Sequence, residues 1–209
     1  MLQQKSYLKI DSRRDTIRKE KREDRRNLSI HTQQINAKKI AKQILALSCF
    51  LEAKNIASYI SSDGEIDTTN LHDLAWSKNK NIFLPQIQDS IKLSFFYFKE
   101  GEKLKNGPWG THEIESPKIE KKLSEMDLII IPMVAFDKNG NRLGRGGGFY
   151  DRVLSESNIT SKNKIYGLAH DIQEVERIPV KENDIPMDGI ITPNKIIDCY
   201  NINLREKNE

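Results

Sequence analysis

Residues 127–152, DLIIIPMVAFDKNGNRLGRGGGFYDR, join the most apolar run of the chain to a glycine-rich segment. The apolar run, residues 128–136, is about half as long as a membrane span and is interrupted by Pro132, so residues 127–132 are predicted to form a buried strand. The glycines follow, and a helix is predicted for residues 149–156. A strand, a glycine-rich loop and a helix in this order are typical of an α/β protein that binds a ligand at the carboxyl end of the strand.

Strand and helix patterns alternate on both sides of this segment. Residues 91–98, IKLSFFYF, alternate strongly and predict an antiparallel edge strand or hairpin arm. Residues 101–118 carry turn residues and predict a long loop. The other predicted elements are strands at 56–60, 82–85, 164–169 and 189–192 and a helix at 68–77. We therefore expect one domain over residues 1–209, a Rossmann-like three-layer α/β/α fold with a mostly parallel sheet.

A basic helix is predicted ahead of this domain, because residues 13–28 lack Gly and Pro and place arginines at every fourth position, Arg14, Arg18, Arg22 and Arg26. Residues 9–26 hold nine Lys and Arg against five Asp and Glu, which accounts for the whole net charge of +4. Such an excess favours an anionic partner, which could be a nucleotide, a polyglutamate, RNA or only water. Ser29 is a plausible N-cap for a second helix, with core-facing Ile35, Ile40, Ile44, Leu45 and Leu47.

The composition excludes several classes of protein. The 209 residues are 37% hydrophobic, enough for one core, and the N-terminus has no apolar segment of the secretory type. Cys49 and Cys199 have neither metal-ligand spacing nor the density of a disulfide scaffold, and the four histidines show no ligand spacing. We expect a cytoplasmic protein with reduced thiols and no membrane association.

The glycine-rich loop has the chemistry of a phosphate site. Without Cβ atoms, its glycines can turn several N–H groups toward one anion, and the following helix adds its positive dipole end; they are Gly144, Gly146, Gly147 and Gly148. Arg142 and Arg145 supply guanidinium groups suited to phosphoryl oxygens. Asp151 is an oxygen ligand suited to the Mg²⁺ that accompanies ATP. We therefore predict an ATP-dependent enzyme.

The loop matches none of the common nucleotide-binding patterns. No Gly-Lys-Ser/Thr follows it, Phe149 replaces the last glycine of GxGxxG, and the chain has no HRD or DFG sequence. A flexible surface loop with solvated arginines remains an alternative. So does an RNA-binding protein that uses the basic helix and the GRGGGF segment, although such segments are usually repeated and disordered.

The sequence NRLGRGGGFYDR closely resembles the signature of the 5-formyltetrahydrofolate cyclo-ligase family, also called methenyltetrahydrofolate synthetases. Four further segments are similar to the family in the same order: RRDTIRKEKREDRR, SYISSDGEIDT, IIIPMVAFD and PVKEND. The resemblance implies conversion of 5-formyltetrahydrofolate and ATP into 5,10-methenyltetrahydrofolate, ADP and phosphate, with Mg²⁺ required. It implies phosphorylation of the formyl oxygen followed by attack of N10, which requires positioning and charge stabilisation but no protein nucleophile. The implied partners are small molecules rather than nucleic acid, and a monomer is expected.

The resemblance also implies roles for individual residues. Arg145 would be catalytic and would serve both substrates. Asp151 and Asp184 would hold Mg²⁺, and Glu65 would accept hydrogen bonds from the pterin ring. ATP would contact Arg14, Arg18, Arg142, Leu143, Gly144, Arg145, Gly146, Gly147, Gly148, Phe149 and Tyr150. The folate would contact Ile60, Glu65, Trp109, Arg145, Gly146, Gly147, Gly148 and Phe149.

The residues alone leave other interpretations open for several of these positions. Asp151 is compatible with a helix cap, Asp184 with an ordinary turn residue, Glu65 with a turn or N-terminal helix charge, and Trp109 with a partly buried loop anchor. The chain also departs from the family pattern twice. Arg14 stands where Lys is usual, which keeps the charge but changes the geometry, and Phe149 stands where Tyr is common, which removes a hydroxyl group.

Overall fold

In the computed structural model, which describes residues 2–88 and 92–199, an eight-stranded sheet forms the centre of the molecule. Its order is β12-β11-β10-β7-β1-β2-β3-β6, and the five central strands from β11 to β2 run parallel. The strands are β1 Asn55–Ala57, β2 Asn81–Gln88, β3 Lys92–Phe98, β6 Glu120–Lys121, β7 Leu128–Pro132, β10 Lys164–Leu168, β11 Gly189–Ile191 and β12 Ile196–Asp198. The predicted α/β class is confirmed, with antiparallel strands only at the two edges.

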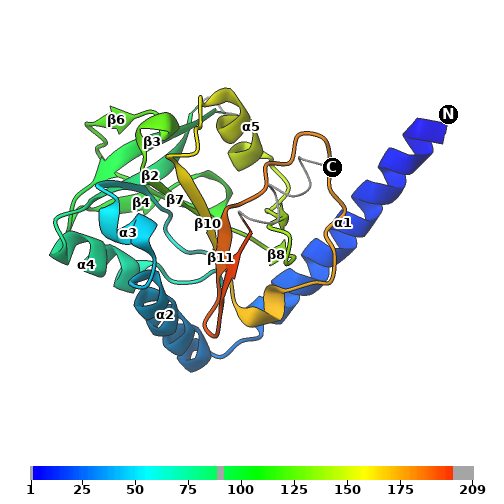
Figure 1. Cartoon of the computed structure of the whole chain (residues 1–209), viewed down its shortest axis with the longest axis horizontal. Coiled ribbons are helices and arrows are strands. Elements are labelled where there is room, and N and C mark those ends of the chain that lie inside the picture. Colours follow the sequence, from blue (N-terminus) through cyan, green and yellow to red (C-terminus); the bar gives the residue numbers. More distant parts are fainter. Residues whose placement is uncertain (1, 89–91, 200–209) are drawn as a thin grey trace.

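Alternate residues of the central strands enter two different hydrophobic cores, which makes the molecule three-layered. Leu128 and Ile130 of β7 pack with the helices α2 Ile30–Ile44, α3 Ser48–Glu52 and α4 Thr69–Ser77 on one face. Ile129 and Ile131 pack on the other face with Leu154 of α5 Phe149–Glu156. Figure 1 shows α2 and α4 together on one side of the sheet and α5 apart from them.

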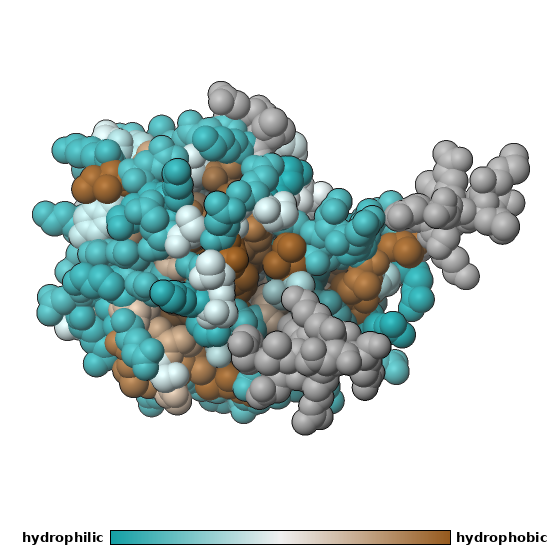
Figure 2. All heavy atoms as spheres, turned by 45° about the horizontal axis from the view of Figure 1, so that its top comes forward, coloured by the Kyte–Doolittle hydropathy of each residue, from teal (hydrophilic) through white to brown (hydrophobic). Residues whose placement is uncertain are grey.

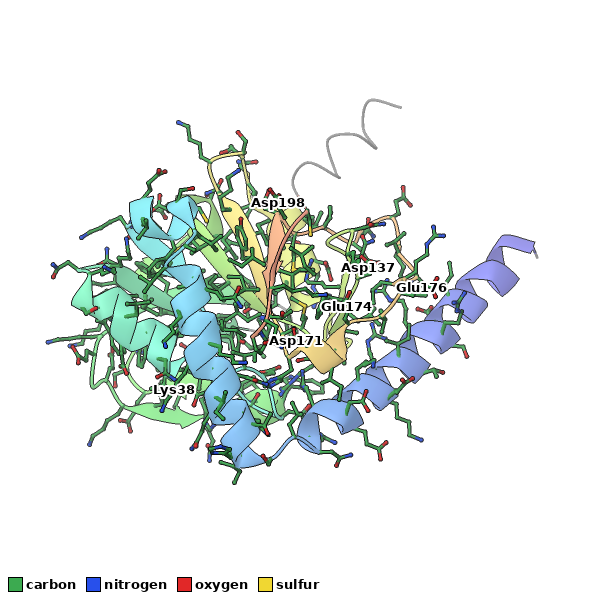
Figure 3. The ribbon with its side chains drawn as sticks, turned by 60° about the horizontal axis from the view of Figure 1, so that its bottom comes forward. Lys38, Asp137, Asp171, Glu174, Glu176 and Asp198 are labelled. Carbon is green, nitrogen blue, oxygen red and sulfur yellow. The ribbon has the colours of Figure 1, made fainter. Side chains whose placement is uncertain are left out.

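The helix α1 Leu2–Arg26 runs along one side of the body, and its N-terminal half projects beyond it (Figure 1). It is longer than the predicted segment 13–28 at its N-terminal end. Its C-terminal half lies against the 3-10 turn η3 Asp171–Gln173, where Lys21 Nζ donates to the carbonyl of Ile172 at 3.0 Å. Figure 3 shows Asp171 and Glu174 at this turn, on the side of the body next to α1.

The predicted second helix is confirmed, with Ser29 Oγ accepting the N–H of Thr32 at 3.1 Å as the N-cap. Ile40 and Ile44 are buried as expected, and Leu47 packs against the same core. The prediction for Ile35 and Leu45 was wrong, because both are exposed. Ile35 lies outside the buried stripe of α2, which consists of Ala37, Ile40, Ala41 and Ile44, and Leu45 is the C-cap residue at which the helix ends.

Strand ends differ more from the predictions than strand positions do. The segment 56–60 leaves the sheet after Ala57, because the chain turns there toward the loop at 61–65. Of the predicted segment 91–98, residues 92–98 form β3, an antiparallel arm paired with β2, whereas the edge strand is β6; residue 91 lies outside the described residues. The predicted long loop at 101–118 contains a small hairpin of β4 Leu104–Asn106 and β5 His112–Ile114, closed by the 3-10 turn η1 Pro108–Gly110.

The hydrophilic residues of the sequence cover most of the visible surface. On the face shown in Figure 2, hydrophobic side chains gather only in small groups separated by hydrophilic ones. None of the helices within the described ranges is both long enough and apolar enough to span a lipid bilayer.

Candidate active site

A cavity of about 660 Å³ opens at the carboxyl ends of the parallel strands β1, β2 and β7. Ile60 and Ser62 reach it from the segment after β1, Pro85 and Ile87 from β2, and Met133 from the segment after β7. The β4–β5 hairpin and the glycine-rich loop close the remaining sides. Ligands of open α/β sheets bind at this edge, so the topology and the cavity point to the same place.

The glycine-rich loop follows the short hairpin of β8 Ala135–Phe136 and β9 Arg142–Leu143 and leads into α5. Gly146 and Gly148 have φ angles of +111° and +64°, a region in which L side chains are strained. Gly148 is the N-cap residue of α5, so the free N–H groups of the first helical turn face the loop. All four predicted glycines and both aromatic residues after them line the cavity, namely Gly144, Gly146, Gly147, Gly148, Phe149 and Tyr150.

Buried Arg142 and half-buried Asp151 form an ion pair at the base of this loop. Arg142 Nη2 donates to Asp151 Oδ1 at 2.6 Å, and its Nη1 donates to the carbonyl of Ile185. Burial lowers the pKa of Arg142, while the charge of Asp151 opposes that shift. Because its guanidinium is committed to these partners, Arg142 fixes the position of Asp151 at the start of α5. Leu143, by contrast, is fully buried in a small core with Ala135 and Ile178, outside the cavity lining.

Two arginines of α1 attach that helix to the body, and neither lines the cavity. Arg14 makes a two-pronged ion pair with Asp184, with Nη2 3.1 Å from Oδ1, and also donates to the carbonyl of Pro179. Burial by itself would raise the pKa of the Asp184 carboxyl, but the hydrogen bond from Arg14 outweighs this and holds the pKa below its ordinary value. Arg18 Nε donates to the carbonyl of Gly144 at 3.0 Å, so it contacts the glycine-rich loop itself.

The C-terminal end of α1 gathers three arginines around Asp63. Arg22 Nε and Arg25 Nη2 each lie 2.9 Å from Asp63 Oδ2, and Arg26 pairs with Oδ1. Burial by itself would raise the pKa of Asp63, but hydrogen bonds from these arginines outweigh it and lower the pKa. Arg25 is fully buried and also donates to the carbonyls of Asp63 and Met133, at 2.8 and 2.9 Å. It therefore ties α1 to two segments that line the cavity.

Arg145 crosses from the glycine-rich loop to the segment after β1. Its Nη2 donates to Ser62 Oγ at 2.7 Å, and its Nε lies 3.3 Å from Glu65 Oε1. Glu65 is buried, which raises the pKa of its carboxyl, while the charges of Arg145 and Arg25 oppose that rise. The structure thus brings together two residues, Arg145 and Glu65, that lie 80 positions apart in the sequence.

Three predicted folate-contacting residues form apolar walls of the cavity: Ile60, Trp109 and Phe149. Trp109 is 75% exposed at the rim and has a φ angle of +60°, which is a strained conformation for a bulky residue. Strain of this kind is concentrated at sites where the backbone serves a ligand. The interpretation of Trp109 as a partly buried anchor does not fit this exposure.

Tyr150 places an unsatisfied polar group at the cavity. Its hydroxyl is buried, and it has no hydrogen-bond partner among the described residues. Burial raises the pKa of this phenol, so it stays a neutral donor. Buried hydroxyl groups are normally hydrogen-bonded, so a ligand is the natural partner of this one.

The predicted metal ligands do not lie together as an acidic cluster. Within residues 2–88 and 92–199, no group of three or more His, Cys, Asp or Glu has the spacing of a metal site. Of the two predicted ligands, Asp151 lines the cavity, whereas Asp184 is outside the lining and pairs with Arg14. One carboxylate beside a phosphate site still fits Mg²⁺, which often binds through one or two carboxylates, substrate phosphates and water.

Several cavity residues had no predicted role, among them Arg22, Ser62, Glu113 and Met133. Ser62 lies within the SSDGEID segment already singled out, and Arg22 within the arginine repeat. Glu113 and Met133 carried no signal, because their place in the cavity depends on pairing between β4 and β5 and on the turn after β7.

The fold and the cavity together define an α/β protein with a glycine-rich loop and a cavity at the carboxyl edge of its sheet. Residues 10–193 match the 5-formyltetrahydrofolate cyclo-ligase family. The 5-formyltetrahydrofolate cyclo-ligase of Haemophilus influenzae is 39% identical over 186 residues, which cover 86% of this chain and 97% of the relative. That of Escherichia coli K12 is 36% identical over 181 residues, 84% of this chain and 97% of the relative. The chain belongs to the 5-formyltetrahydrofolate cyclo-ligase family.

A solved structure supports the same assignment. The NMR structure of Aquifex aeolicus 5,10-methenyltetrahydrofolate synthetase superposes with a TM-score of 0.77 at 29% identity, covering 89% of this chain and 92% of that one. The expected family and fold are therefore confirmed. The alternative of an RNA-binding protein finds no support among these relatives.

Proposed function

We propose that this protein catalyses the ATP-dependent cyclisation of 5-formyltetrahydrofolate to 5,10-methenyltetrahydrofolate, with release of ADP and phosphate. It is thus a ligase that forms a C–N bond. The observation that carries the proposal is the position of Arg145, which joins the phosphate loop to the Ser62–Glu65 segment within one cavity. Transfer of a phosphoryl group between two bound substrates requires one site of this kind.

In this proposal the glycine-rich loop binds the triphosphate of ATP. Main-chain N–H groups at Gly146–Gly148 and at the start of α5 donate to its oxygens. Arg18, which already contacts Gly144, and Arg14 approach from α1. The hydroxyl of Tyr150 donates to the nucleotide, and Arg142 holds the loop and Asp151 in place.

The folate occupies the apolar part of the cavity between Ile60, Trp109 and Phe149. Glu65 accepts a hydrogen bond from the pterin ring. Arg145 stabilises the negative charge that develops as the γ-phosphoryl group passes to the formyl oxygen. N10 then attacks the formyl carbon, phosphate leaves with the oxygen, and N10 loses its proton.

Mg²⁺ belongs to the same proposal, bound by Asp151 together with phosphate oxygens; it would neutralise charge on the transferring phosphoryl group. Asp184 is the second proposed ligand, and its ion pair with Arg14 would have to open first.

The test is direct. The purified protein, mixed with 5-formyltetrahydrofolate, ATP and Mg²⁺, should generate the methenyl chromophore, with one ADP released per product. No change in absorbance that depends on ATP would refute the proposal. Binding to RNA that weakens steeply with salt would instead support the alternative function.

We also propose that the protein acts as a monomer in the cytoplasm and binds no nucleic acid. Light scattering coupled to size-exclusion chromatography tests the monomer: a mass near 24.1 kDa is expected for one chain.

A further inference from the structure

Glu113 of β5 is a buried carboxylate that the residue assignments above leave without a role. It is 6% exposed and lines the cavity on the side formed by β2 and the β4–β5 hairpin. Its Oε1 accepts the N–H of Ile87 at 3.1 Å. Among the described residues, no ion pair or further hydrogen bond involves this carboxylate.

Its electrostatic setting differs from that of the other two carboxylates in the cavity. Asp151 is paired with Arg142, and Glu65 lies beside Arg145 and Arg25. Within the part of the chain that the structure describes, Glu113 has no such cation. A buried carboxylate without a counter-charge is costly unless donors satisfy it, so a ligand with N–H donors gains more here than at Glu65.

The surroundings favour a flat heterocycle. Pro85, Ile87 and Leu93 form an apolar wall on this side of the cavity, and Ile87 and Leu93 belong to the same hydrophobic cluster as Phe149. The chain also makes room for the acidic side chain: a Cβ added at Gly107 would lie 2.7 Å from Glu113 Cγ and 2.8 Å from its Cδ. Any larger residue at position 107 would displace the carboxylate.

We propose that Glu113 determines specificity for the pterin ring by accepting the two adjacent donors of its pyrimidine edge, N3–H and the 2-amino group. This inference rests on the proposed function. Glu65 then serves a ring N–H nearer the formyl group, because its Oε1 already faces Arg145 and its Oε2 already accepts the N–H of Ser62 at 3.1 Å.

The experiment compares 5-formyltetrahydrofolate with its 2-desamino analogue in steady-state assays. Wild-type protein should show a KM for the analogue about 10- to 100-fold higher, the scale of one lost hydrogen bond to a charged group, with little change in the KM for ATP. Glu113→Gln, which keeps an oxygen for the N–H of Ile87, should raise the KM for the normal substrate and bring that ratio close to one. Glu115→Gln is the matched control, because Glu115 is exposed two residues further along the chain.

The outcomes separate the inference from the function on which it rests. Absence of activity in wild-type protein would refute the function, whereas full activity with equal KM values for the two substrates would refute only the role of Glu113. If Glu65→Gln brings the ratio of the two KM values close to one and Glu113→Gln leaves it unchanged, N3–H and the 2-amino group bind at Glu65 and the inference is wrong. Gly107→Ala provides a second test without changing the carboxylate, and it too should reduce the discrimination.

Discussion

Replacing Arg145 by alanine is expected to lower turnover by roughly 100- to 1000-fold, the effect of removing one preorganised group that stabilises charge in the transition state. The structure explains the preorganisation. Ser62 Oγ and the carboxylate of Glu65 hold the guanidinium between the phosphate loop and the folate side of the cavity, at 2.7 and 3.3 Å. If the charge of Arg145 acts mainly in the transition state, as proposed, kcat should fall far more than the two KM values change.

Arg145→Ala should lose little folding stability, so that its loss of activity can be measured on folded protein. Arg145 has 29% of its side chain exposed, and Glu65 keeps Arg25 at 3.7 Å when Arg145 is removed. A cost on the order of 1 kcal/mol would lower the melting temperature by about 2–4 °C in a chain of this size. Arg145→Lys should recover only part of the activity, because lysine lacks the guanidinium fork.

The assay follows the methenyl chromophore with each substrate varied in turn. Lys138→Ala is the control, because it removes an exposed cation from the turn that precedes the loop, outside the cavity lining. A kcat of Arg145→Ala within a few-fold of wild type, with Lys138→Ala fully active, would show that Arg145 does not stabilise the transferring phosphoryl group.

Two further predictions concern the metal and the pH dependence of stability. Asp151→Asn should raise the Mg²⁺ concentration needed for half-maximal activity, and an unchanged Mg²⁺ titration would argue against a ligand role. His72, hydrogen-bonded to Ser58 at 2.8 Å, has its pKa lowered by burial to about 4. As the pH falls, the imidazole takes up a proton near pH 6.5 in the unfolded chain but only near pH 4 in the folded protein. Stability that is fully present above pH 6.5 is therefore lost as the pH falls from 6.5 to about 4. The unfolding free energy, measured in urea, should therefore decline over this range less steeply in His72→Gln than in wild type; equal slopes would exclude the contribution of His72.

The sequence predicted those helices and strands whose own residues show a regular hydrophobic pattern with recognisable ends. The helix α5 has the predicted bounds, because glycines precede it and an amphipathic pattern fills it. The strand β12 was not predicted. Its pairing with β11 depends on a turn at residues 192–195, and its three residues carry no pattern of their own. Exposure of Ile35 likewise depends on how far α2 is covered, which no local pattern specifies.

The same distinction applies to the candidate site. The glycine-rich loop was predictable because its residues are contiguous and each contributes to one type of ligand. The repeat at every fourth residue marked Arg14, Arg18, Arg22 and Arg26, but the fully buried arginine is Arg25, outside that repeat. Its burial depends on carbonyls at Asp63 and Met133, 38 and 108 residues away.

The charges around the cavity bear on how ATP would be held. The lining residues within the described chain include three arginines and three carboxylates, Arg22, Arg142 and Arg145 against Glu65, Glu113 and Asp151. Side-chain charges therefore nearly cancel, and an incoming triphosphate must be neutralised by other groups. In the proposed function, the N–H groups of the loop and of the first turn of α5 supply part of this, together with Arg14 and Arg18 of α1, and a divalent cation at Asp151 would supply a further part. We therefore expect activity to depend on a divalent cation, because the arginines that line the cavity are already engaged by protein carboxylates.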